Sequence, residues 1–196
     1  MIYYLGKFLF WCIFTVFCRW KVDGRDNVPD NGPVVVVANH VSYWDPIVVG
    51  VAVKRKVRFM AKAELFRIPV LGWTIKAMGA FPVNRGRLDT STVKKALKIL
   101  SEGGAVGVFP EGTRSRTGEL GPFHSGAVAL AIKSGALIVP VALKGTAEIF
   151  KKGRFHRFSV RIGTPIAVGP SRPGEEPKAE ILNVKLREEV ESLLKR

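Results

Sequence analysis

Two side chains that can share a proton lie five residues apart near the beginning of the chain. His40 and Asp45 follow the mostly β-branched run at 33–38, which the pattern predicts to be a buried strand. A carboxylate beside a histidine fixes the imidazole tautomer and stabilises the imidazolium, so the pair is suited to general-base chemistry. Asp45 before Pro46 is also a good helix N-cap, with Ser42 three residues ahead as in a capping box. A capping carboxylate keeps one oxygen free, so the two roles are compatible.

A second polar segment, at 109–116, reads Phe-Pro-Glu-Gly-Thr-Arg-Ser-Arg and follows the short apolar run at 105–108. Arginine presents forked donors that match phosphate, and a glycine in the turn lets backbone N–H groups approach an anion. The segment is not a Walker A loop, because no Gly-Lys-Ser or Gly-Lys-Thr ends a glycine-rich turn. Taken alone, the pattern favours a solvated, charged loop over a binding site.

Together the two motifs resemble those of the glycerolipid acyltransferase family, in particular the 1-acylglycerol-3-phosphate (lysophosphatidate) acyltransferases. That family carries four blocks in a fixed order, which correspond here to residues 39–45, 79–85, 109–116 and 138–142. The first and third blocks are highly specific, and the other two are weak taken alone. The resemblance implies an α/β domain that moves a fatty acyl group from a thioester to the 2-hydroxyl of lysophosphatidate. The product would be phosphatidic acid, as in phospholipid biosynthesis.

The resemblance also implies a role for the polar residues of these blocks. His40 is expected to be the general base and Asp45 to orient it. The residues expected to hold the glycerol phosphate are Arg85, Glu111, Gly112, Thr113 and Arg114. Lys62, at the end of the predicted strand 57–61, is a candidate to support the phosphate or the oxyanion. An ordinary surface lysine is an equally good interpretation of Lys62.

We expect direct acyl transfer, with no acyl-enzyme. The Gly-x-Ser-x-Gly nucleophile motif is absent, because Phe123 stands where a glycine would have to precede Ser125. Ser42 is two residues from His40, an awkward position for attack. The three histidines lack metal-ligand spacing, so no metal is expected, and no cofactor is expected beyond the acyl donor. Acyl-CoA and acyl carrier protein remain equally open as that donor.

The charge of the chain predicts an acidic partner. Its 196 residues carry a formal net charge of +15, which suits an anionic membrane, nucleic acid or an acidic protein. With the resemblance, the expected partners are an anionic membrane surface, a lysophospholipid, and acyl-CoA or acyl carrier protein. Within the family, the alternative acceptors are glycerol-3-phosphate or another lysolipid. A nucleic-acid-binding module is the alternative from a different class, but it leaves both motifs unexplained, so no nucleic acid is expected.

The amino terminus raises the question of membrane contact. Residues 8–18 are uncharged and aromatic-rich, and they are too few for a spanning helix, which needs about 20 apolar residues. They lack the features of a cleaved signal peptide. We expect an interfacial helix, with peripheral or monotopic binding at the cytoplasmic face of the cell membrane. The alternative is a helix packed on the protein's own core. The expected membrane contacts are Phe8, Trp11, Phe14 and Phe17.

Two other segments are further candidates for membrane contact. The segment 65–73 mixes large apolar residues with turn formers, and a buried helix start is an equally good interpretation. The segment 150–158 interleaves basic and aromatic residues. That pattern suits a membrane surface or single-stranded nucleic acid, although a solvated hairpin is the favoured interpretation.

Apolar periodicity and turn residues predict alternating strands and helices in a chain the size of one domain. The pattern favours an α/β fold: a mostly parallel central sheet flanked by helices, with an N-terminal apolar membrane-interface helix. Three segments are expected: a membrane-associating helix at 1–21, the α/β acyltransferase domain at 22–168, and a linker with a C-terminal helix at 169–196. The predicted strands are 33–38, 57–61, 80–84, 105–109, 137–143 and 157–163. The predicted helices are 3–19, 46–53, 69–78, 90–102, 124–134 and 178–195.

Overall fold

The computed structural model describes residues 2–83, 90–169 and 177–196. Its helices are α1 (Ile2–Val16), α2 (Asp45–Ala52), α3 (Leu71–Ala77), α4 (Thr90–Ser101), α5 (Gly126–Ser134) and α6 (Pro177–Lys195). Its strands are β1 (Lys21–Asp23), β2 (Val34–Ala38), β3 (Val57–Lys62), β4 (Phe81–Val83), β5 (Ala105–Val108), β6 (Leu137–Lys144), β7 (Phe150–Lys151), β8 (Arg154–Phe155) and β9 (Ser159–Ile162). Short 3-10 helices lie at Arg25–Asn27, Ala63–Arg67 and Thr146–Glu148.

Seven of these strands form one sheet in the order β1-β9-β6-β2-β5-β3-β4. In the described part of the chain, five of its ladders are parallel and the β6–β9 ladder is antiparallel. The predicted α/β class with a mostly parallel central sheet is therefore confirmed. The small exposed hairpin β7–β8 confirms the favoured interpretation of the segment 150–158. β1 was not expected, because a strand of three residues is too short to show a period in the sequence.

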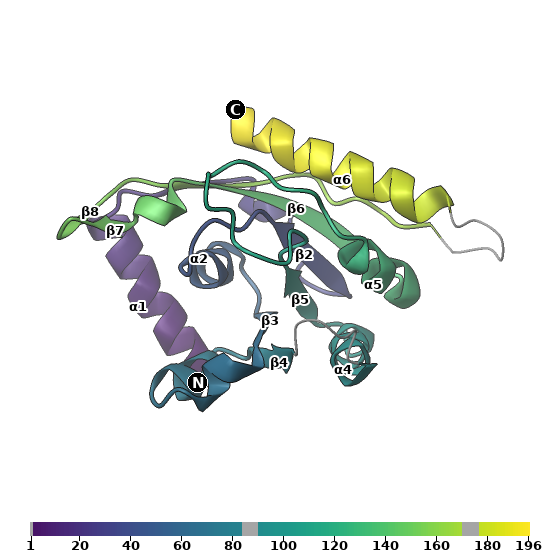
Figure 1. The fold of residues 1–196 in the computed structure, drawn as a ribbon, viewed down its shortest axis with the longest axis horizontal. Coiled ribbons are helices and arrows are strands. Elements are labelled where there is room, and N and C mark those ends of the chain that lie inside the picture. The colour runs from purple at the N-terminus through teal and green to yellow at the C-terminus, as the bar shows by residue number, and fades with distance from the viewer. Residues whose placement is uncertain (1, 84–89, 170–176) are drawn as a thin grey trace.

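The central strand β2 is buried on both sides, as its run of β-branched residues predicts. Val34 and Val36 belong to the core that includes residues of α1 and α2, and Val35 and Val37 belong to the core that includes residues of α4, α5 and α6. Figure 1 shows these two sets of helices on opposite faces of the sheet. The strand is thus held rigidly, and its carboxyl end is a fixed point from which the next residues leave.

The terminal helices pack on this same sheet. In α6, Leu186 and Val190 are fully buried in the core they share with α5 and β6. In α1, Phe14 is 1% exposed, in the core that α2 and β9 also line. The described helices α1 and α6 therefore both pack on the central sheet.

The helix α1 has an inner and an outer face. Phe14 was expected to contact a membrane, and that expectation is wrong, because its ring packs on Phe158 at 5.1 Å and on Trp20 at 5.5 Å. Away from this core, Phe8 is 62% exposed, and Phe17, directly after the helix, is 59% exposed. Core packing therefore accounts for the apolar residues on one face of α1 and leaves those on the exposed face without a core partner among the described residues. Among the described residues, no helix has both the length and the apolar character needed to cross a bilayer.

Candidate active site

The two specific motifs meet because they follow neighbouring parallel strands. β2 pairs with β5 in the register Val37 to Val108. Since parallel strands end at the same edge of a sheet, the segment that begins at Asn39 and the segment that begins at Phe109 leave the sheet side by side. This is where open α/β sheets place their binding residues.

His40 and Asp45 form a close pair. Nδ1 of His40 lies 2.8 Å from Oδ2 of Asp45, and the same oxygen accepts hydrogen bonds from the backbone N–H groups of Val41 and Ser42, both at 2.7 Å. The Asp45 side chain is fully buried, and its Oδ1 has no hydrogen-bond partner within the described residues. A carboxylate anchored by two backbone donors holds the imidazole in one orientation. Within the same residues, no hydrogen bond reaches Nε2 of His40, and the side chain is 12% exposed.

The interpretation of Asp45 as an N-cap is wrong. Asp45 is the first residue of α2 and Trp44 precedes it in the capping position, without a side-chain cap. The carboxylate of Asp45 bonds to residues before the helix and not to the first N–H groups inside it. The hydroxyl oxygen of Ser42 accepts a hydrogen bond from the N–H of Trp44 at 3.2 Å, so it shapes the turn.

The third motif holds the ring face and the backbone of His40, whereas Asp45 holds the ring edge at Nδ1. The ring of Phe109 stacks on the imidazole with centroids 4.1 Å apart and planes 18° apart. The N–H of Ser115 donates to the carbonyl oxygen of His40 at 2.8 Å. Phe59 stacks in turn on Phe109, at 5.4 Å between the centroids. The ring face and the backbone of the histidine are therefore both held by the segment that follows β5.

Glu111 uses both of its carboxylate oxygens on the backbone. Oε1 accepts a hydrogen bond from the N–H of His40 at 2.7 Å, and Oε2 accepts one from the N–H of Gly121 at 3.0 Å. The side chain thus joins the histidine to both ends of the loop between β5 and α5. No pattern in the sequence distinguishes such a carboxylate from one that faces a substrate.

The loop after Glu111 is open to solvent. Gly112 has a φ of 70°, a left-handed conformation that suits glycine, and Thr113 and Arg114 are exposed. The guanidinium carbon of Arg114 lies 3.5 Å from the centroid of the Tyr43 ring. Stacking on an aromatic face fixes the guanidinium plane and leaves its N–H edge available to an anion. Sequence reasoning missed Tyr43, although it belongs to the first motif.

Of the other two expected site residues, the structure describes one, Lys62. Lys62 ends β3 and forms an ion pair with Glu64 at 3.2 Å, with 44% of its side chain exposed. Arg85 lies outside the described residues. β4 pairs with β3 in the register Val83 to Lys62, so Val83 of the second motif lies beside Lys62.

The fourth motif contributes packing. It forms the middle of β6, where Ile138, Val139 and Val141 are fully buried. β6 is also tied to the first motif, because the side-chain oxygen of Asn39 accepts from the N–H of Leu143 at 2.7 Å. The side-chain nitrogen of Asn39 donates to the carbonyl oxygen of the same residue at 3.0 Å. Asn39 therefore fixes the backbone immediately before His40.

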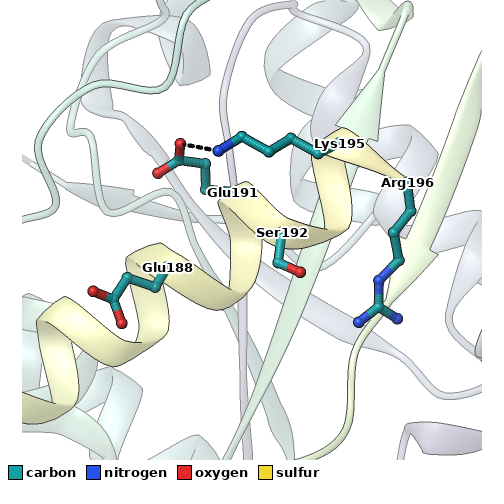
Figure 2. A pocket seen from close by; sticks show the side chains of 5 residues that line it. All are labelled: Glu188, Glu191, Ser192, Lys195 and Arg196. Atoms are coloured by element: carbon teal, nitrogen blue, oxygen red, sulfur yellow. Dashed lines mark ion pairs between the residues drawn. The ribbon is translucent and has the colours of Figure 1, made fainter.

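A surface hollow of about 500 Å³ lies at the carboxyl end of α6. Figure 2 shows its lining, with an ion pair between Lys195 and Glu191 whose atoms are 2.7 Å apart. Its described lining residues come from the last turns of α6 and the residue that follows it, and none belongs to the motifs described above. They are Glu188, Glu191, Ser192, Lys195 and Arg196. We assign this hollow no role in the chemistry.

Comparisons with known proteins show the family of this chain. A family model described as Acyltransferase matches residues 19–144. The chain is similar to the 1-acyl-sn-glycerol-3-phosphate acyltransferase of Bacillus subtilis, with 36% identity over 177 residues that cover 86% of each chain. It is also 36% identical to a chloroplastic 1-acyl-sn-glycerol-3-phosphate acyltransferase of Brassica napus over 148 residues. That alignment covers 73% of this chain and 43% of the plant protein, so the chain spans less than half the length of this relative.

A solved structure shares the whole fold. The crystal structure of the 1-acyl-sn-glycerophosphate (LPA) acyltransferase from Thermotoga maritima matches with a TM-score of 0.75 and 30% identity. The match covers 100% of this chain and 79% of that one. With a family match over more than half of its residues and a bacterial relative aligned along most of both lengths, the chain belongs to the acyltransferase family.

Proposed function

We propose that this protein transfers a fatty acyl group from a thioester donor to the 2-hydroxyl of 1-acylglycerol-3-phosphate and so makes phosphatidic acid. One observation carries the proposal: the His40–Asp45 pair lies against the loop 109–116, whose exposed Thr113 and Arg114 suit a phosphate. Relatives that carry the name of this activity support the choice of acceptor.

The chemistry follows from the free nitrogen of the histidine. Nε2 of His40 takes the proton of the 2-hydroxyl, and the hydroxyl oxygen forms a bond to the thioester carbonyl carbon. When the tetrahedral intermediate collapses, the C–S bond breaks and the imidazolium returns its proton to the departing thiolate. Asp45 stabilises the imidazolium between these two steps. General-base catalysis of this kind contributes about 10²–10⁴-fold.

The phosphate of the acceptor is held by cations and backbone donors. Arg114, fixed on Tyr43, offers a forked pair of N–H groups, and the turn at Gly112 and Thr113 leaves the backbone accessible. Arg85 and Lys62 complete this set in the proposal. The ion pair of Lys62 with Glu64 is half exposed and therefore weak, so a phosphate can replace it.

Glu111 has a different role from the one expected of it. A carboxylate repels a phosphate, and both oxygens of Glu111 already accept backbone hydrogen bonds. We assign it to positioning His40.

The proposed location of the enzyme is the cytoplasmic membrane surface, in peripheral or monotopic form. Exposed Phe8 and Trp11 on α1 and Phe17 directly after it provide apolar contact, and the net charge of +15 favours anionic lipid. The donor is acyl-CoA or acyl carrier protein, both of which carry negative charge.

The test is acyl transfer by the purified protein in detergent micelles, with each donor in a separate reaction. Lysophosphatidate, glycerol-3-phosphate and lysophosphatidylcholine are offered as acceptors. The proposal expects transfer to lysophosphatidate to be fastest. Faster transfer to either of the others would contradict the proposed acceptor, and no transfer to any of them would contradict the proposed reaction.

A further inference from the structure

The hairpin at residues 150–155 carries aromatic and basic side chains that the proposed reaction does not use. Its two strands pair Phe150 with Phe155 and Lys151 with Arg154. Residues directly opposite each other in an antiparallel pair share a face, so the two rings lie on one face and the two cations on the other. The rings are 5.1 Å apart between centroids, and they are 53% and 41% exposed.

The tip of the hairpin holds a lysine where the backbone favours asparagine or glycine. Lys152 has a φ of 52° and Gly153 a φ of 74°. Two successive positive φ values are typical of a type I′ turn, for which Asn-Gly is a preferred sequence. A lysine in the left-handed region is uncommon. The backbone conformation therefore disfavours a lysine at this position. A need for positive charge at the tip would explain why a lysine is present.

The aromatic face of the hairpin continues the outer face of α1. The ring of Phe155 lies 5.4 Å from the ring of Phe17, which is itself 59% exposed. Figure 1 shows the hairpin beside the end of α1 that is farther from the chain's amino terminus. Phe8 and Trp11 extend the exposed apolar residues along the helix. The exposed apolar side chains of the amino-terminal helix thus meet the hairpin at Phe17.

The cations of the hairpin are only partly compensated. Lys151 pairs with Glu148 at 2.7 Å. Lys152 and Arg154 are exposed, and in the described part of the chain neither forms an ion pair. An exposed aromatic face with the unpaired Lys152 at its tip combines the apolar and electrostatic terms by which proteins bind an anionic lipid surface.

We propose that the hairpin is a second contact with an anionic membrane, which acts together with α1. The inference rests on the proposed function only in that both place the enzyme at a lipid surface. Single-stranded nucleic acid also binds aromatic and basic side chains, but it has no use for the exposed apolar residues of α1, such as Leu5 and Leu9. The lipid surface accounts for both elements at once.

The test is co-sedimentation of the full chain with vesicles. One set contains phosphatidylcholine alone, and the other contains equal parts of phosphatidylcholine and phosphatidylglycerol. The variants are Lys152→Asn, which improves the turn while it removes the charge, and Phe150→Ser. The matched control is Lys185→Gln, which removes one exposed charge from α6 on the opposite face of the sheet. Acyl transfer in micelles, measured in parallel, tests the proposed function separately.

With anionic vesicles, we expect Lys152→Asn to weaken binding about fivefold, because a basic residue near such a surface contributes a factor of this size. Phe150→Ser should weaken binding to both vesicle types, and Lys185→Gln should leave both unchanged. Transfer in micelles should stay at the wild-type rate in all three. Wild-type vesicle binding by both hairpin variants would overturn the inference. Equal losses of vesicle binding in Lys152→Asn and Lys185→Gln would also overturn it. So would hairpin variants that lose binding to single-stranded DNA but keep wild-type binding to vesicles.

Discussion

Replacing Glu111 by glutamine separates a positioning role from a substrate-binding role. In the native protein, the two carboxylate oxygens accept from the N–H groups of His40 and Gly121, at 2.7 and 3.0 Å. A glutamine amide has one oxygen and one NH₂ group. Its oxygen can accept from one of these two N–H groups, and its NH₂ group then faces the second N–H, with which it cannot form a hydrogen bond. The backbone of the catalytic histidine then loses one of its fixed points.

The size of the effect follows from these contacts. A hydrogen bond to a charged group contributes about 1.5–3 kcal/mol. If the loss appears in the transition state, where Nε2 must be aligned, kcat falls about 10–100-fold, since about 1.4 kcal/mol corresponds to a factor of ten. KM for lysophosphatidate should change little, because the phosphate contacts are untouched. Steady-state acyl transfer in micelles gives both constants.

The matched control is Glu119→Gln, which makes the same charge change at an exposed residue of the same loop. It should behave as the wild type. Thermal unfolding of both variants verifies that they are folded. If Glu111→Gln raises KM and leaves kcat unchanged, the positioning role is refuted and Glu111 belongs to the phosphate site.

Three further predictions concern Asp45, Phe14 and Lys7. Asp45→Asn keeps an oxygen for the three hydrogen bonds but removes the charge that stabilises the imidazolium of His40, so the rate in micelles should fall on the order of 10²–10⁴-fold; a fall below tenfold would contradict this. Phe14→Ala should lower the free energy of unfolding in urea by about 3–5 kcal/mol, because the ring is 1% exposed, and an effect as small as that of the exposed Phe8→Ala would show that Phe14 is not core. Burial lowers the pKa of Lys7 from 10.5 to about 8. Between these values the unfolded chain binds more protons, so wild-type stability should gain on that of Lys7→Met as the pH rises from 8 to 10; a constant difference in urea unfolding would refute it.

Much of the frame of this site could be predicted from the sequence, because its signals are local. The run at 33–38 has the composition of a buried strand, and β2 forms at 34–38. Gly103 and Gly104 are helix-stop residues, and α4 ends just before them at Ser101, close to the predicted end at residue 102. The pairing of His40 with Asp45 needed only their spacing and a strand to hold them.

The remaining features depend on contacts between distant segments. Phe14 and Phe17 are both apolar residues of one helical run, and only the packing of α1 on the sheet puts the first in the core and the second outside. Glu111 bonds to His40 across 71 positions of sequence, and no local pattern predicts which donor a loop carboxylate will meet. The stacking of Arg114 on Tyr43 likewise required the register of β2 and β5.

The measurement that tests the central claim most directly is acyl transfer to lysophosphatidate by His40→Ala in micelles, beside the wild type and the control His156→Ala. His156 is exposed and lies in neither motif. We predict that the wild type and His156→Ala transfer the acyl group at similar rates and that His40→Ala loses the activity by at least about 10²-fold. Full activity in His40→Ala would contradict the account, because the proton of the acceptor hydroxyl would then leave by another route.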